Sequence, residues 1–383
     1  MNIAPSQPAR SGTPPQPVNA ASAASTRLGQ RTAAILFGVL AGTVLTALIA
    51  IGSRGFHWFD DALIGYAVGT IFAVAAVTYK YTFWLMRPQT GRYFWRSWRL
   101  FFSVANFRKY TALIPTAILT DLLTQQFIRK RSIYRWVMHQ CIFWGVVLSC
   151  LITFPLTFGW LRFTSTVTGQ YRMWAFGFPL FSFDPYSVLG FTIYHALVFT
   201  ALLLLVGLIM AFHRRFHDLA LVAVQRYRFD VVPLALLLAI VVTGLALTLD
   251  STFLSGAYYW YISLIHEAVV VFWLISLPFG KFFHIIERPA TVGIELYWRT
   301  GEDSEPHRCA RCGKVFAPAR FIGDLKRTLH DIGQDYTVRQ VEPGAPATVE
   351  RDAWWQDFCP DCKRIIRGEG NLAALGREGN QFL

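Results

Sequence analysis

The sequence predicts an all-α polytopic membrane protein, a six-helix transmembrane bundle followed by a small cytoplasmic metal-binding domain. Only 15% of its 383 residues are charged and 54% are hydrophobic, whereas about 25% of a typical soluble domain is charged. Apolar runs of about 20 residues, enough for a helix to cross a ~30 Å hydrocarbon core, recur along the chain. Two Cys-x-x-C pairs near the C-terminus are typical of a metal site. This composition excludes a disordered chain and argues against one large soluble domain.

The chain divides by composition into three parts. Residues 1–30 are rich in Pro, Ser, Ala and Gln, so we expect a disordered tail. Residues 31–288 form the predicted transmembrane part, and its first apolar run exceeds the apolar core of a signal peptide, which favours an uncleaved span. Residues 289–383 have the composition of a small soluble domain. The expected spans are 33–53, 62–86, 136–160, 187–212, 231–250 and 258–283.

Basic residues gather in alternate loops. The loop 87–135 is rich in Arg and Lys and holds Asp121 as its single acid, and the loop after the fourth span is also basic. The positive-inside rule therefore predicts that both termini and these loops are cytoplasmic. The apolar stretch 111–127 is expected along the membrane surface, in contact with lipid. The net charge of +13 falls beside apolar segments rather than on one polar domain, which argues against a nucleic-acid partner.

Histidines at the predicted spans indicate haem binding. Low-spin haem b needs one imidazole on each face of the iron, from helices at matching depth. His266 and His284 lie 18 residues apart, five turns of one continuous helix, so they are expected on one face and ~27 Å apart. By depth, His139 matches His284 at the cytoplasmic side, and His195 matches His266 in the outer half. One or two b haems are therefore predicted, although a lone membrane histidine can also be a packing residue.

The segments around these histidines resemble a known family. Arg135-Trp136-Val137-Met138-His139 is similar to the ligand helix of membrane cytochrome b subunits in heterodisulfide reductase and sulfite-reduction complexes. The run from Tyr259 through His266 to His284 resembles the last helix of those proteins and of the respiratory nitrate reductase gamma subunit. The resemblance covers about residues 62–290.

The resemblance implies a function in electron transfer. In that family, five helices hold two b haems and pass electrons between quinone or quinol and cytoplasmic iron–sulfur or molybdenum-type oxidoreductase subunits. It implies a prokaryotic plasma membrane and haem ligation by His139, His266 and His284. The nitrate reductase subunit has a second histidine where this chain has Ser149. Either His195 supplies the fourth ligand or the outer haem is absent.

The C-terminal cysteines form two knuckles, Cys309/Cys312 and Cys359/Cys362. Four thiolates suit zinc, a single iron or an iron–sulfur cluster. The first knuckle resembles the opening of a ferredoxin domain, but Val315 and Ala319 stand where further ferredoxin cysteines would be. Zinc is therefore favoured over iron. Cys141 and Cys150, inside an apolar segment, are expected to be packing residues.

Glu267 is a candidate proton acceptor for quinol oxidation, because ionisable groups inside a membrane are costly and often functional. The structural alternative is that Glu267 pairs with a neighbouring polar side chain or lies in the outer interface. No residue offers substrate chemistry beyond electron and proton transfer, so the sequence predicts an electron-transfer subunit rather than a complete enzyme. Two other functions stay open: a haem-free anchor whose zinc domain docks a partner, and a transporter.

Overall fold

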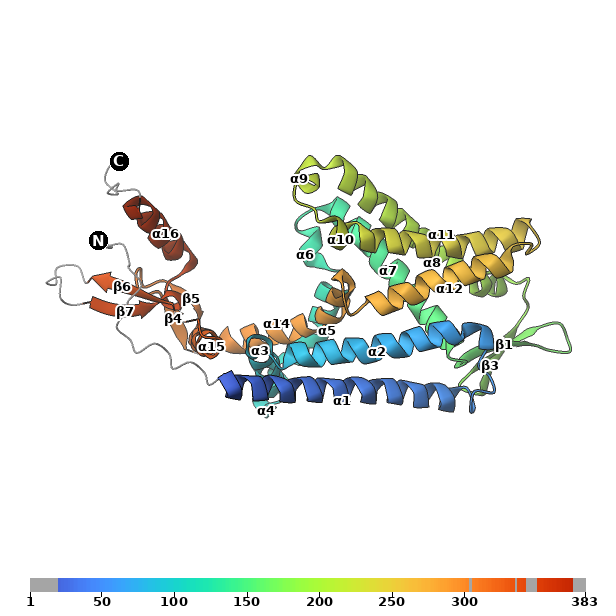
Figure 1. The fold of residues 1–383 in the computed structure, drawn as a ribbon, viewed down its shortest axis with the longest axis horizontal. Helices are drawn as coiled ribbons and strands as arrows, with labels where there is room; N and C mark the ends of the chain where they lie inside the picture. The colour runs from blue at the N-terminus through green and yellow to red at the C-terminus, as the bar shows by residue number, and fades with distance from the viewer. Residues whose placement is uncertain (1–19, 303–304, 335, 342–349, 375–383) are drawn as a thin grey trace. The chain divides into compact units, whose positions relative to one another are not determined.

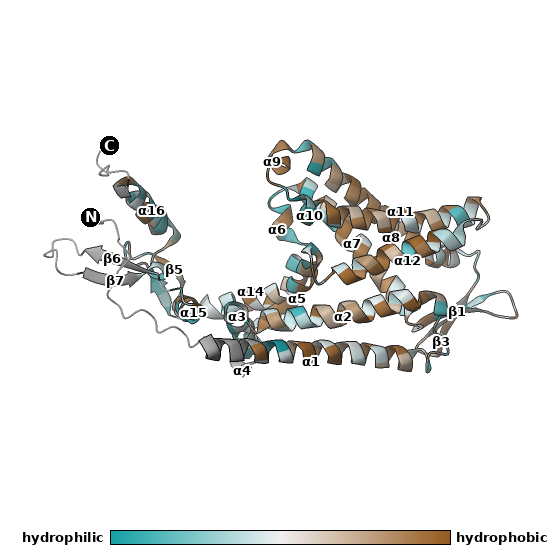
Figure 2. Cartoon of the chain, viewed as in Figure 1, coloured by the Kyte–Doolittle hydropathy of each residue, from teal (hydrophilic) through white to brown (hydrophobic). Residues whose placement is uncertain are grey.

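The computed structural model describes residues 20–302, 305–334, 336–341 and 350–374. Within these residues, six helices are long and apolar enough to cross a membrane. Figure 2 shows them as the predominantly apolar part of the chain. The predicted fold class, a helical multi-pass membrane protein with a cysteine cluster in its C-terminal region, is therefore confirmed. The six helices are α1 (Ala20–Gly52), α2 (Ile64–Leu85), α7 (Ile133–Thr157), α8 (Val188–His217), α11 (Val232–Phe253) and α12 (Tyr259–Ser276).

Two compact units make up the chain, and we describe each by itself. The bundle unit comprises 32–82 and 118–289, and the tail unit comprises the described residues of 1–31, 83–117 and 290–383. The bundle unit ends at residue 289, and the basic stretch 83–117 belongs to the tail unit.

The tail unit is built around three amphipathic helices. Helix α3 (Pro88–Phe101) contacts α14 (Ala290–Glu302) and α15 (Ala319–Asp331). The fully buried Asp324 carboxylate on α15 binds Arg96 on α3 and accepts a hydrogen bond of 2.6 Å from the Tyr297 hydroxyl on α14. A buried charge is stable only when it is paired in this way, so this ion pair explains why the basic stretch joins the tail unit. Its other elements are α4 (Val104–Tyr110), α5 (Leu113–Ala117), β4 (Pro306–Arg308), β5 (Val315–Pro318), β6 (Thr337–Val341), β7 (Glu350–Trp354), η4 (Trp355–Asp357) and α16 (Pro360–Ala374).

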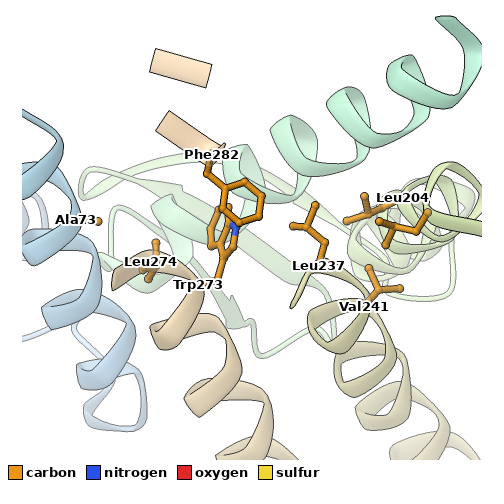
Figure 3. Close-up of a cluster of buried hydrophobic side chains, with 8 residues drawn as sticks. Ala73, Leu204, Leu237, Val241, Trp273, Leu274 and Phe282 are labelled. Atoms are coloured by element: carbon orange, nitrogen blue, oxygen red, sulfur yellow. The ribbon is translucent and has the colours of Figure 1, made fainter. Parts of the chain in front are cut away.

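In the bundle unit, α7 packs closely along α8, and α11 contacts both α8 and α12 (Figure 1). Glycines allow the α7–α8 approach: a Cβ on Gly145 would lie 2.7 Å from the Leu204 side chain, too close for any real pair of atoms. Apolar side chains from α2, α8, α11 and α12 form the core, and Figure 3 shows Trp273 beside Phe282 within it. Short segments connect the long helices: η1 (Asp61–Leu63), η2 (Ile118–Leu123), α6 (Gln126–Arg129), α9 (Leu219–Val222) and α10 (Tyr227–Asp230).

A three-stranded antiparallel sheet joins α7 to α8, where the sequence analysis expected only a loop. Its strands are β1 (Leu161–Ser165), β2 (Tyr171–Ala175) and β3 (Phe178–Phe183), in the order β1-β2-β3. Phe176 and Gly177 both adopt positive φ, 49° and 87°, which closes the tight turn between β2 and β3. We call this end of the bundle the sheet end. The opposite end, where α7 begins and α8 and α12 end, is the basic end.

The last predicted span is interrupted, which corrects the expectation of one helix carrying two histidines. Helix α12 ends at Ser276, and the chain resumes as η3 (Lys281–Phe283) and α13 (His284–Glu287). Pro278 has no backbone N–H and cannot continue the hydrogen-bond pattern of the helix. Its carbonyl accepts a 2.7 Å hydrogen bond from the Lys80 ammonium on α2. His266 and His284 therefore do not share one helical face, and the helical rise does not give their separation.

One other expectation differs from the structure. Helix α1 begins at Ala20, so the end of the segment expected to be disordered is helical, while residues 1–19 lie outside the described residues. The stretch 111–127, expected along the membrane surface, contains α5, η2 and the start of α6. The remaining span boundaries lie within a few residues of those predicted.

Candidate functional site

The basic end carries both His139 and His284. His139 lies on the second turn of α7 and His284 begins α13, and the two are close enough to interact electrostatically. The Nδ1 atom of His139 is buried without a hydrogen-bond partner. The Nδ1 atom of His284 contacts the Lys281 carbonyl, which can fix its tautomer and leave Nε2 available. The two histidines expected to match in depth therefore both lie at the basic end and interact electrostatically.

Cationic side chains surround this histidine pair. Arg288 interacts electrostatically with His139, and its guanidinium lies 4.9 Å from the centre of the Phe127 ring. The Arg129 guanidinium lies 5.5 Å from the Trp136 ring on the first turn of α7. The Lys281 ammonium donates a 2.7 Å hydrogen bond to Asp230. Of these cations, Arg288 is the one that acts electrostatically on His139, whereas Lys281 is paired with Asp230.

The carboxylate of Asp230 anchors the segment that carries His284. The hydrogen bond from Lys281 and the backbone N–H of Arg226 lower the pKa of Asp230 to about 2. Arg215 at the end of α8 lies 3.3 Å from the same carboxylate. Asp230 thus ties η3 to α8 after α12 has ended.

A cavity of about 430 Å³ lies inside the bundle, among α2, α7, α8, α11 and α12. Its lining extends along α7 from Val146 to Thr157, a rise of ~16 Å. His266 is its one histidine, and no Asp, Glu, Lys or Arg is among the described residues that line it. The lining is mostly aliphatic, with scattered hydroxyl groups from Ser149, Thr153, Tyr66 and Tyr194.

The tautomer of His266 follows from its hydrogen bonds. The Thr243 hydroxyl on α11 donates to the Ala239 carbonyl at 2.7 Å, and its oxygen lies 2.8 Å from Nδ1 of His266. Since the hydroxyl proton is committed to Ala239, Nδ1 of His266 donates to the Thr243 oxygen. The Nε2 atom is then an unprotonated acceptor. Hydrogen positions are assigned here from the network.

Trp273 is a polar cavity residue that the sequence analysis missed. It lies seven residues after His266, two helical turns further along the same face of α12. The residue is 8% exposed, lines the cavity, and its indole nitrogen is buried without a hydrogen-bond partner. The seven-residue spacing in a histidine-bearing span was the signal that could have identified it.

His195 does not join His266 at this cavity. Its neighbours Tyr194, Leu197 and Val198 line the cavity, whereas His195 stacks on Phe191 with ring centroids 4.1 Å apart. Its Nδ1 contacts the Phe191 carbonyl at 2.8 Å. Ser149, in contrast, does line the cavity and shares a 2.8 Å hydrogen bond with Thr200. The cavity therefore presents one imidazole and not two.

Glu267 lies against α2 and not in the cavity. A Cβ on Gly65 would clash with the Glu267 carboxylate, so the carboxylate packs directly on the glycine backbone. Glu267 also interacts electrostatically with Tyr66, which does line the cavity. Glu267 is therefore one side chain removed from the cavity.

The four cysteines of the tail unit converge. Their sulfur atoms all lie within 4.8 Å of one another, and Sγ of Cys312 is 3.7 Å from Sγ of Cys359. Four sulfurs at ~2.3 Å from a tetrahedral metal would be ~3.8 Å apart, so the cluster can hold a metal ion. Cys141 and Cys150 are on α7, outside this cluster.

Local backbone geometry positions the thiols. The first knuckle is the turn between β4 and β5, closed by Gly313 at φ +70°, and the second begins α16. Burial alone would raise the pKa of the Cys309 thiol, but backbone N–H groups of Cys312, Cys359 and Arg311 together lower it to about 6. Burial raises the pKa of Cys362 to about 12. The cluster thus holds one readily formed thiolate and one thiol whose ionisation requires a nearby cation.

Together, the fold and these sites define a helical multi-pass membrane protein with a cluster of four cysteines that could hold a metal ion. Comparison with protein-family models, with curated proteins and with solved structures finds no match to this chain.

Proposed function

We propose that this protein is a membrane-bound b-type cytochrome subunit that transfers electrons between quinone or quinol and a cytoplasmic oxidoreductase. The observation that carries the proposal is that two separate helices each place one histidine, His139 on α7 and His284 on α13, at the basic end, and that the two imidazoles interact electrostatically.

The residues at the basic end would supply ligands to a haem. His139 and His284 would offer one imidazole each, and the Lys281 carbonyl would hold the second in its ligating tautomer. Arg288 would offset the negative charge of the propionates. A haem bound there would supply reversible one-electron transfer. The protein contributes the ligand geometry and the electrostatic surroundings that set its potential.

We propose a single haem. The other two predicted ligands, His266 and His195, are not brought together, since only His266 lines the cavity. Of the two readings that the sequence left open, the absence of an outer haem agrees better with this arrangement.

The tail unit would bind zinc and dock the soluble partner. The sulfur spacing suits a tetrahedral ion, and zinc has no accessible redox change, so it would stabilise the fold instead of carrying electrons. The basic loops would face the cytoplasm of a prokaryotic cell and place both termini on that side. The partner, an iron–sulfur or molybdenum-type enzyme, would then meet the haem at the basic end.

A pyridine haemochrome assay on the purified full-length protein tests this proposal. We expect b haem at one equivalent per chain, with a low-spin spectrum that changes when dithionite is added. Colourless protein, purified under conditions that load a control cytochrome expressed in the same host, would overturn the proposal. It would favour the haem-free anchor instead.

A further inference from the structure

We propose that the cavity lined by His266 and Trp273 binds the ring of an isoprenoid quinone, in the place where a second haem would otherwise be expected. The proposal deepens the function proposed above, on which it rests. The cavity volume of about 430 Å³ lies within the range of ~300–1,000 Å³ that is usual for small-molecule sites.

Two polar groups, one of them unpartnered, give the cavity its specificity. The Nε2 atom of His266 is an acceptor, because Nδ1 donates to Thr243. The buried indole N–H of Trp273 is a donor without a partner. A quinone carbonyl accepts from such a donor, and a quinol hydroxyl donates to such an acceptor. The cavity therefore offers one group for each redox form of the ring.

The uncharged lining indicates that the ligand of the cavity is a quinone rather than a haem. A haem carries two propionates, and burying them beside aliphatic side chains without cations is strongly unfavourable. No charged side chain lines this cavity within the described part of the chain, and His266 has no second histidine opposite. A quinone is neutral in both its oxidised and its fully reduced forms. The charge of the lining therefore favours the quinone.

The position of the cavity also suits this ligand. Its end at Val146 is seven residues from His139 along α7, a rise of ~10 Å. A ring beside Trp273 would thus lie near the basic-end histidines, without a second haem between them. Tyr194 and Leu197 line the cavity and are 46% and 41% exposed, which gives the apolar tail a route to lipid along α8.

Equilibrium binding of decylubiquinone to the full-length protein in detergent tests the site. Val146→Phe places an aromatic ring in the cavity and should weaken binding at least tenfold. Val242→Phe is the matched control, because Val242 is 53% exposed and does not line the cavity. Trp273→Phe keeps the aromatic volume but removes the donor, and should weaken binding about three- to tenfold. Unchanged binding in Val146→Phe, with the fold intact, would overturn the proposal.

Haem content separates this inference from the proposed function. One haem per chain in both the wild type and Val146→Phe, with binding lost only in the variant, supports both proposals. Protein that binds decylubiquinone in the cavity but holds no haem would overturn only the proposed function. Two haems per chain, one of them lost in His266→Ala, would overturn the quinone assignment.

Discussion

The basic end and the cavity of the bundle present histidines in opposite electrical surroundings. At the basic end, His139 interacts electrostatically with His284 and Arg288, and the Lys281–Asp230 ion pair holds the segment that carries His284. In the cavity, His266 faces aliphatic side chains and hydroxyl groups, with Trp273 as its polar companion. This difference indicates that the ligand of a histidine within a membrane cannot be predicted from the depth of that histidine alone. Charge and a second imidazole decide which ligand can bind.

The largest expected effect comes from removing one basic-end histidine. His139→Ala or His284→Ala leaves the iron with one protein imidazole, so the low-spin haem signal should be lost and haem content should fall to near zero. The haem-to-protein ratio and the low-temperature electron paramagnetic resonance spectrum measure this loss.

His195→Ala is the matched control for these variants, because its ring stacks on Phe191 outside the cavity. The control should keep its full haem content. If both basic-end variants kept the wild-type spectrum, His139 and His284 would not be the haem ligands. The haem would then be bound elsewhere, and the comparison between the basic end and the cavity would fail.

The next largest effect is expected from the cysteine variants of the tail unit. They test whether ligand binding in the bundle is independent of the metal site in the tail unit. Cys309→Ser or Cys362→Ser removes one of four thiolates, and metal binding is coupled to the folding of such small domains. Metal content measured by mass spectrometry should fall from one equivalent, and trypsin should cut the C-terminal region faster. Cys141→Ser should change neither property.

The haem spectrum of the two cysteine variants should equal that of the wild type. A loss of haem in them would show that the bundle depends on the metal domain. Stoichiometric iron in the wild-type domain would instead indicate that the tail unit carries electrons.

A smaller effect is expected at Glu267, which lies one side chain away from the cavity. Glu267→Gln should slow quinol-driven haem reduction several-fold in stopped-flow measurements, because general acid–base groups contribute to proton transfer. Haem content and reduction by dithionite should stay unchanged. Asp60→Asn, at an exposed position before α2, is the control. Equal rates in Glu267→Gln and the wild type would remove Glu267 from the proton path.

The smallest effect concerns the anchor of His284. The folded-state pKa of Asp230 is about 2 and the unfolded value is about 3.9, so its stabilisation is present above pH ~4 and is lost as the pH falls toward 2. Because Lys281 is 47% exposed, the pair contributes at most about 1 kcal/mol. Lys281→Gln should lower the midpoint of thermal haem release slightly at pH 6, and the difference should vanish near pH 2. A difference that grows on acidification would contradict this assignment.

Hydropathy predicted the six spans well, because a bilayer imposes the same length and polarity on each helix. The last span was extended too far, since Leu277 and Phe279 continue the apolar run although Pro278 and Gly280 interrupt the helix. The sheet was also missed. Its signals were local, namely aromatic strands of five or six residues and a Phe176-Gly177 turn, and they are weak beside the signal of a span.

The site residues differed in how far sequence could predict them. The four cysteines were predictable as a group, because each knuckle fixes two sulfurs and a metal-binding domain must bring two knuckles together. The presence of His139 and His284 at the same end of the bundle followed from their expected depth. The position of His195 outside the cavity could not be predicted in this way. Depth fixes the height of a side chain in the membrane but not the direction in which it points from the helix.

The sheet end also bears on the order in which the protein assembles. The Trp160 indole donates to the Leu48 carbonyl on α1 at 3.1 Å, and the Arg54 guanidinium donates to the Gly177 carbonyl at 3.1 Å. During synthesis, α1 therefore emerges from the ribosome more than a hundred residues before the groups that fasten its far end. Until Trp160 and Gly177 are synthesised, the Leu48 carbonyl and the Arg54 guanidinium lack these two hydrogen-bond partners. The contacts that hold the far end of α1 are therefore completed only when the sheet after α7 forms.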